Sequence, residues 1–302
     1  MILKKRSESL ELIASRCLNT RMEWSSKEKF HLANLEKGYK GEVEFDRLTD
    51  NLSEERYIID DLLLEVNNSF FQIDKVIISG ALIHLLDVKY HEGDFYLESD
   101  RLYSVKNGKE YKNSVIQLKP SETLFRQLLQ NLKFDYLVQA SLVFNNLEFT
   151  LYQAPMDQPI ILPTQINRFL KELNDTPSKL GQNHKLLAQK LLELHHEKNP
   201  YTTLPDYNYE KLKKGMYCHI CGSFKTEIKN FDLVCGKCGE QERIEQAVLR
   251  SIQDLKILFP EIKITTQIIN EWCDGKISKK TITKVLKKNY VSTGRTSDTY
   301  YE

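Results

Sequence analysis

The sequence predicts a multidomain α/β protein. Three observations indicate this class: helical and strand-like patterns alternate up to about residue 153, a stretch rich in helix formers follows, and four cysteines precede a further set of helical patterns. At 302 residues the chain is long enough for several domains, each with its own core. Its 41% hydrophobic and 28% charged residues are typical of a globular protein.

The first elements are helical. In "SSKEKF", Ser25 and Glu28 have the spacing of a capping box, which predicts that a helix begins there. Gly38 and Gly41 in "KGYKGE" are expected to interrupt this helix, because glycine has a low helix propensity. A second helical pattern follows, with Phe45 on its apolar face.

Strands and a further helix complete the first domain. Four strand-like runs come in order: "RYIIDDLLLEV", "FFQIDKVIIS", "LIHLLDVKYH" and "DFYLES". The segment "PSETLFRQLLQNL" predicts a helix opened by Pro120 and Ser121, and "LVQASLVFNN" and "LEFTLYQ" predict two more strands. An α/β domain that ends near Gln153 is therefore expected, followed by a helical connector from Pro163 to about Lys198.

The hairpin over residues 71–89 carries charges among its apolar residues. A two-residue turn that begins with Gly80 fits the type II′ requirement and sets the register of the two strands. This register places Asp74 opposite Asp87, and Gln72 opposite Lys89, with the Cβ atoms of each pair about 5 Å apart on one face. A slip of one residue would separate these pairs, so the prediction depends on the register.

Two carboxylates that face each other repel, and a divalent cation resolves the repulsion. Mg²⁺ is commonly held by one or two carboxylates together with water and substrate phosphate. Lys89 beside the pair can stabilise phosphate charge or orient the attacking water. The alternative is that these charges simply face solvent. Apolar residues on both faces of the hairpin favour the metal site.

Four short motifs resemble those of a known family. They are "GYKGE" with Glu42, "QID" with Asp74, "DVK" with Asp87 and Lys89, and "NSVIQ" with Asn113 and Gln117. Their order and spacing, from about Lys37 to Gln153, resemble the nuclease-related domain (NERD), a branch of the PD-(D/E)xK nuclease superfamily. The match coincides with the residues that the hairpin geometry selects.

The resemblance implies a metal-dependent nuclease site. It implies that Glu42 joins Asp74 and Asp87 around Mg²⁺ or Mn²⁺, that Lys89 lies at the attacking water, and that Gln117 supports the site. Helical periodicity leaves Glu42 and Glu44 equivalent, and within the resemblance the preceding glycine selects Glu42.

The sequence departs from the family pattern at two positions. The usual Glu of the "ExK" element is Asp87, and the proline that often follows the asparagine is Ser114. The aspartate is shorter by one methylene, which is expected to draw the metal toward the strand without abolishing its binding.

A four-cysteine segment follows the connector. Its cysteines form two Cys-x₂-Cys pairs separated by thirteen residues, each pair followed by a glycine: Cys218, Cys221, Cys235 and Cys238. This spacing resembles a zinc ribbon and predicts one structural Zn²⁺ with all four protein positions filled. A redox dithiol or free core cysteines are the alternatives, and neither explains two matching pairs.

The C-terminal segment is basic. Helical patterns over residues 241–289 and a small polar hairpin resemble a winged helix. The candidate nucleic-acid contacts are Lys279, Lys280, Lys284, Lys287, Lys288 and, at the wing tip, Arg295. A protein partner or a merely solvated lysine face is the alternative.

Together these patterns predict five segments and two hypotheses for function. The segments are residues 1–36 (N-terminal helical), 37–153 (NERD-like), 154–210 (helical connector), 215–240 (zinc ribbon) and 241–302 (winged-helix-like). The first hypothesis is a metal-dependent nuclease that hydrolyses DNA, with RNA as an alternative substrate. The second is a non-catalytic nucleic-acid- or protein-binding regulator on a nuclease-like scaffold. With no apolar run near the ~20 residues of a membrane span and no export signal, a cytoplasmic location is expected.

Overall fold

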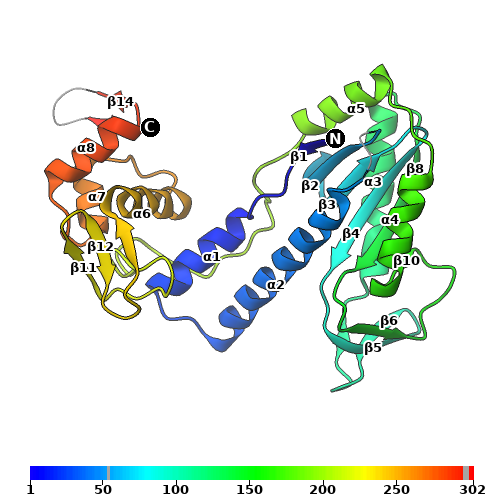
Figure 1. Ribbon diagram of the computed structural model, residues 1–302, viewed down its shortest axis with the longest axis horizontal. Helices are drawn as coiled ribbons and strands as arrows, with labels where there is room; N and C mark the ends of the chain where they lie inside the picture. The colour runs from blue at the N-terminus through cyan, green and yellow to red at the C-terminus, as the bar shows by residue number, and fades with distance from the viewer. Residues whose placement is uncertain (53–54, 295–298) are drawn as a thin grey trace. The chain divides into compact units, whose positions relative to one another are not determined.

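The computed structural model describes residues 1–52, 55–294 and 299–302 (Figure 1). Contacts within the chain divide it into two units, and each is described by itself. Unit 1 comprises Met1–Glu8 and Ala33–Tyr201, and unit 2 comprises Ser9–Leu32 and Thr202–Glu302. No helix among the described residues is long and apolar enough to cross a bilayer.

Unit 1 is built on a mixed six-stranded sheet in the order β1-β2-β3-β4-β8-β10. Its strands are β1 (Ile2–Lys4), β2 (Tyr57–Val66), β3 (Ser69–Ile78), β4 (Leu82–Lys89), β8 (Leu137–Phe144) and β10 (Ile160–Ile161). β2, β3 and β4 form an antiparallel meander, whereas β8 pairs with β4 in parallel after a helical crossover. The predicted strands of this domain are therefore present.

Helices cover both faces of this sheet (Figure 1). On one face lie α3 (Ser114–Asn131) and α5 (Gln182–Glu193), whose buried residues share a core cluster with strands of the sheet. On the other face, α2 (Ser26–Thr49) and α4 (Ile166–Asp175) join a second cluster that contains Leu86. Each of these helices packs on the sheet because this contact buries the apolar stripe of an amphipathic helix.

A second, four-stranded sheet of unit 1 has the order β7-β6-β5-β9. Its strands are β5 (Gly93–Glu98), β6 (Arg101–Ser104), β7 (Glu110–Tyr111) and β9 (Phe149–Tyr152). Phe95, Leu102 and Phe149 on its inner face belong to the same core cluster as α3. Because β5 follows β4 after only a short loop, this sheet continues the chain directly beyond Lys89.

Three sequence predictions about helices need correction. The capping box is present, since Ser25 and Glu28 bond each other, but α2 runs without a break through Gly38 and Gly41. α3 begins at Ser114 rather than at Pro120, because the Asn113 side chain caps it by accepting from the Val115 amide (3.0 Å). α4 and α5 are not a connector, since their apolar faces pack on the sheet and place them in unit 1.

The N-terminal 36 residues are likewise not purely helical. Ile2–Lys4 forms β1 in unit 1, and α1 (Leu10–Arg21) belongs to unit 2. The fully buried Arg21 explains the second assignment. Its guanidinium donates to Asp254 (3.1 Å) and to the Lys213 carbonyl (2.9 Å), and lies 4.1 Å from the Trp272 ring centroid.

Unit 2 contains a three-stranded sheet and a hairpin, which share one core cluster with α1 and with the helices that follow the sheet. Its further elements are β11 (Thr226–Lys229), β12 (Asp232–Cys235), β13 (Gln241–Arg243), α6 (Ile244–Leu258), α7 (Thr266–Trp272), α8 (Lys279–Asn289), β14 (Ser292–Thr293) and β15 (Tyr300–Tyr301). Ile264 forms an isolated bridge to Tyr301, so the hairpin extends toward α7. The order α6, α7, α8, β14 and β15 is the order of elements predicted for the winged-helix-like segment. The predicted contact Arg295 lies outside the described residues.

Candidate functional site

The β3–β4 hairpin has the predicted register but a different turn. The ladder runs from Ile78↔Ile83 to Lys75↔Leu86, as the sequence predicts. Gly80 is not among the glycines of positive φ, so the turn is not type II′. A contact from outside the hairpin holds the turn instead, since the Gly80 backbone amide donates to the Ser178 hydroxyl (3.0 Å).

The two strands separate immediately beyond Lys75 and Leu86, where Asp74 and Asp87 follow. Asp74 Oδ2 accepts a hydrogen bond from the Val88 amide (2.7 Å), which replaces the next backbone pairing. The predicted pairings of Asp74 with Asp87 and of Gln72 with Lys89 are therefore not formed, and the side-chain amide of Gln72 donates to Asp61 on β2 (2.8 Å). The separation creates room beside both aspartates.

Asp87 and Lys89 lie on one face of β4 and contact each other. Lys89 Nζ donates to Asp87 Oδ1 (2.8 Å). Burial, and then the neighbouring Asp74 carboxylate, raises the pKa of Asp87 to about 7. Burial lowers the pKa of Lys89, but the carboxylates around it outweigh burial and the net shift is upward. A buried carboxylate, Asp74, next to the half-buried Asp87 carboxylate is an environment that favours a cation in addition to the Lys89 ammonium.

Glu42 approaches this pair from α2. Burial, and then Asp74, raises its pKa to about 8. Arg6, which the sequence analysis did not single out, donates to Glu42 Oε2 (2.8 Å) and to Asp46 Oδ2 one turn further along the helix (2.8 Å). A third bond from Arg6 reaches the carbonyl of Asp74 (2.6 Å), so this side chain connects α2 to β3.

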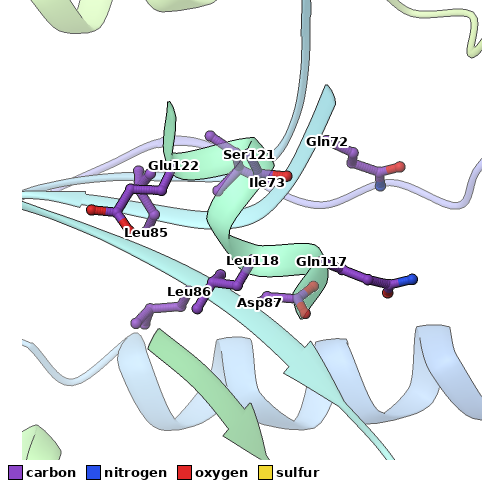
Figure 2. Close-up of a pocket in the computed structure, with 9 residues that line it drawn as sticks. All are labelled: Gln72, Ile73, Leu85, Leu86, Asp87, Gln117, Leu118, Ser121 and Glu122. Atoms are coloured by element: carbon purple, nitrogen blue, oxygen red, sulfur yellow. The ribbon is translucent and has the colours of Figure 1, made fainter. Parts of the chain in front are cut away.

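Gln117 and Asp87 line a pocket between the separated strands and α3. The pocket has a volume of about 160 Å³, and Figure 2 shows the Gln117 side chain on the same side of it as the Asp87 carboxylate. The pocket is lined by Gln72, Ile73, Leu85, Leu86, Asp87, Gln117, Leu118, Ser121 and Glu122. α3 thus brings the predicted supporting residue to the predicted catalytic strand.

A buried ion network lies next to this site and was also missed. Lys75, fully buried, forms ion pairs with Asp60 on β2 and with Asp46 on α2 (3.0 Å to Asp46). Asp46 in turn bonds Arg6. The signal for this network in the sequence is the presence of charged residues within an otherwise apolar strand, such as the two aspartates of "IIDDLLL".

The predicted site residues are thus neighbours, but they do not form a closed acidic cage. In the part of the chain that the structure describes, the four cysteines are the only set of three or more potential ligands whose atoms all lie within 4.8 Å of one another. Asp74 and Asp87 are adjacent, while Glu42 is bonded to Arg6. The oxygen donors and the crowding of negative charge fit a hard divalent cation at the aspartate pair.

Gly41 is required for the close packing of α2 against the end of β4. A Cβ added at Gly41 would lie 2.4 Å from Tyr90 Cβ, and the Gly41 carbonyl accepts from the side-chain amide of Asn145 (2.9 Å). Since Tyr90 follows Lys89 directly, this contact sets how closely Glu42 approaches the lysine and the aspartates.

Gly41→Ala is expected to destabilise unit 1 by about 3 kcal/mol, because a rigid backbone or Tyr90 must move to relieve the clash. The matched control is Gly38→Ala on the same helix, where an added Cβ meets nothing within 4 Å. That variant should gain about 0.5–1 kcal/mol from helix propensity. Urea unfolding followed by circular dichroism measures both, and similar effects of the two changes would contradict this account.

The four cysteines converge as predicted in unit 2. The Sγ distances of Cys218 to Cys238 and of Cys221 to Cys235 are both 3.6 Å, close to the ~3.8 Å between sulfurs on a tetrahedral zinc ion. Each pair closes a turn in which the amide of the following glycine donates to the carbonyl of the first cysteine (2.9 Å at both Gly222 and Gly239). Both glycines have positive φ, as the prediction requires. This cluster could bind zinc with no position left for a substrate.

Removal of the metal is expected to destabilise unit 2 by several kcal/mol, because structural zinc contributes to folding directly. Cys221→Ser should bind less than one zinc per chain and lower the unfolding midpoint reported by tryptophan fluorescence. Both tryptophans, Trp24 and Trp272, lie in unit 2. Cys17→Ser, at a buried cysteine outside the cluster, is the control for zinc content. A full zinc complement in Cys221→Ser would contradict the assignment.

The fold and the site together define an α/β domain with clustered acidic residues beside a lysine, and a four-cysteine cluster that could bind zinc lies in the same chain. Residues 37–145 match the family model of the nuclease-related domain, NERD. The match extends from α2 to the residue after β8 and includes every predicted catalytic residue. No curated protein and no solved structure matches the chain.

Proposed function

We propose that the chain is a divalent-metal-dependent nuclease that hydrolyses phosphodiester bonds of DNA. One observation carries the proposal: within a nuclease-related domain, the separation of β3 and β4 leaves Asp74, Asp87 and Lys89 together in a site that favours a cation. Sequence chemistry and site geometry thus support the same residues. RNA is the alternative substrate, because a phosphodiester site does not by itself distinguish the two.

Asp74 and Asp87 are the residues that would hold Mg²⁺ or Mn²⁺, whereas Glu42, the third predicted acidic ligand, is bonded to Arg6. When bound, the metal supplies Lewis acidity and lowers the pKa of a coordinated water. The bond from Val88 to Asp74 Oδ2 and the bond from Lys89 to Asp87 Oδ1 orient the two carboxylates. Burial of the Asp87 carboxylate and its repulsion with Asp74 both raise the pKa of Asp87. A bound cation would offset both effects, because it stabilises the ionised carboxylate.

Lys89 would stabilise the charge that develops on the phosphoryl oxygens, because its ammonium is fixed beside Asp87 and remains protonated. Gln117 can donate from its amide to water or phosphate in the pocket beside Asp87. Gln117 on α3 lines this pocket together with Asp87 of β4, and Lys89 is connected to it through its bond to Asp87.

Unit 2 would bring the nuclease-related domain to DNA, with its C-terminal part acting as a winged helix and its cysteine cluster holding one structural Zn²⁺. The exposed lysines of α8 support this role: Lys279, Lys280, Lys284, Lys287 and Lys288. Lys279 and Lys280 stand in the first turn of α8, where the helix dipole disfavours positive charge. A phosphate partner at this helix end would offset that unfavourable placement.

Reversing charge on α8 tests the DNA contact. Lys284→Glu with Lys287→Glu should weaken binding to duplex DNA at least tenfold at low salt and reduce the slope of log K against log salt by about 2. Lys171→Glu with Lys185→Glu, on α4 and α5, makes the same change in net charge at exposed positions of unit 1. Fluorescence anisotropy measures both variants. If binding by the α8 variant is unchanged, unit 2 takes a protein partner instead.

The second candidate is a non-catalytic binding protein on a nuclease-like scaffold. The bond from Arg6 to Glu42 favours this candidate, because the Arg6 guanidinium already binds a carboxylate that was predicted to bind the metal. The replacement of the usual glutamate by Asp87 points the same way.

Metal dependence separates the two candidates. Plasmid, linear and single-stranded DNA are incubated with the protein in Mg²⁺, Mn²⁺ or EDTA, beside Lys89→Ala and Asp74→Ala. A nuclease is expected to cleave in either metal, to stop in EDTA and to lose activity in both variants. Equal cleavage by all three proteins would indicate a contaminating enzyme, and no cleavage by any would favour the scaffold.

A further inference from the structure

Arg6 is a buried cation inside the candidate metal site. Its side chain is 3% exposed and donates to Glu42, to Asp46 and to the carbonyl of Asp74 at 2.6–2.8 Å. Both carboxylates that it binds lie on one face of α2, four residues apart. Two carboxylates at this spacing next to Asp74 are where a second cation would otherwise be bound.

Arg6 is also held in place by its surroundings. It follows β1, which pairs with β2 in parallel, and Lys4 beside it donates to the carbonyls of Asp60 (2.9 Å) and Asp61 (2.7 Å). Displacing the guanidinium would leave Asp46 with Lys75 as its ion-pair partner and break three bonds from one side chain. Breaking buried charge pairs in this way is strongly unfavourable.

The charges around the site balance with one divalent cation. Five carboxylates face three cations in this cluster: Glu42, Asp46, Asp60, Asp74 and Asp87 against Arg6, Lys75 and Lys89. When all five carboxylates are ionised, two negative charges remain, and the neighbouring Lys4 and Asp61 cancel each other. In that state one divalent cation neutralises the cluster, whereas two would leave two positive charges before any phosphate arrives.

We infer that this site takes a single divalent cation, at Asp74 and Asp87, and that Arg6 is a positioning residue that holds Glu42 and Asp46 out of metal coordination and supplies the positive charge of a second ion. The inference rests on the proposed function, because it concerns the same metal. The contacts of Arg6 also assign a role to the N-terminal segment Met1–Glu8, which lies outside the residues matched by the family model.

Counting bound Mn²⁺ tests the inference without any nuclease assay. The full-length protein, saturated with zinc so that the cysteine cluster is filled, is titrated with Mn²⁺ and the bound ion is counted by calorimetry and electron paramagnetic resonance. Wild type is expected to bind one Mn²⁺ and Arg6→Met two, the second at Glu42 and Asp46. The matched control is Arg47→Met, an exposed arginine on the same helix, which should bind one. Two ions in wild type, or one in a folded Arg6→Met, would overturn the inference.

A second variant keeps the test decisive if Arg6→Met does not fold. Glu42→Gln leaves Arg6 in place and should change Mn²⁺ affinity by less than about threefold, because an arginine-bound carboxylate is not a ligand. Asp74→Asn should weaken it more than tenfold. Equal losses in the two variants would show that Glu42 coordinates the ion and refute the inference.

The inference and the proposed function can fail separately. One bound Mn²⁺ without DNA cleavage would refute the proposed function alone, and two bound Mn²⁺ ions with DNA cleavage would refute the inference alone.

Discussion

Asp74→Asn is expected to lower the rate of DNA cleavage by about 10³-fold, because a Lewis-acidic metal contributes several kcal/mol to the transition state. Asp74 is buried and connected to the other charged groups of the site: its Oδ2 accepts from the amide of Val88, between Asp87 and Lys89, and Arg6 bonds both Glu42 and the Asp74 carbonyl. Loss of its charge therefore weakens metal binding more than any other single change at the site. Initial rates over a range of Mg²⁺ concentrations measure the effect.

The fold should survive this change. The amide oxygen of an asparagine can still accept from the Val88 amide, and a buried negative charge is removed from beside Asp87. The control is Asp94→Asn at an exposed position of β5, which should cleave at the wild-type rate. An Asp74→Asn protein that cleaves within a factor of ten of wild type would exclude Asp74 as a metal ligand.

Lys75→Met is expected to have the largest effect on stability, a loss of about 3–5 kcal/mol from the free energy of unfolding of unit 1. The change leaves Asp60 buried without its ion-pair partner and removes one of the two partners of Asp46. Circular dichroism should show an earlier transition for unit 1. Tryptophan fluorescence should not change, because both tryptophans lie in unit 2.

The pH dependence of this loss has a defined sign. Burial already raises the pKa of Asp60, and removal of Lys75 raises it further. A carboxyl whose folded pKa exceeds its unfolded value loses stability as pH rises between the two values. The variant should therefore lose more stability at pH 8 than at pH 5. The double variant Lys75→Met with Asp60→Asn should recover part of the loss, and no recovery would show that the ion pair is not its source.

Local patterns predicted much of the fold and the site from the sequence. The six predicted strands of unit 1, the register of the β3–β4 hairpin as far as Lys75 and Leu86, and the cap at Ser25 follow from alternation and capping chemistry. The cysteine spacing predicted the four-sulfur cluster for the same reason. The start of α3 was predicted wrongly at Pro120, because the side chain of Asn113 caps the helix earlier in the chain.

Contacts between distant residues decided the rest. Arg6 meets Glu42 and Asp46 across more than thirty residues, and no periodic pattern announces that pairing. Gly41 remains inside a helix because packing against Tyr90 requires a residue without a side chain, which helix propensity alone does not show. By itself the sequence determined the local geometry around the candidate site residues, since residue type and short-range spacing set that geometry. Only the tertiary structure decided which charges face one another, because a buried charge must find a partner wherever the fold places one.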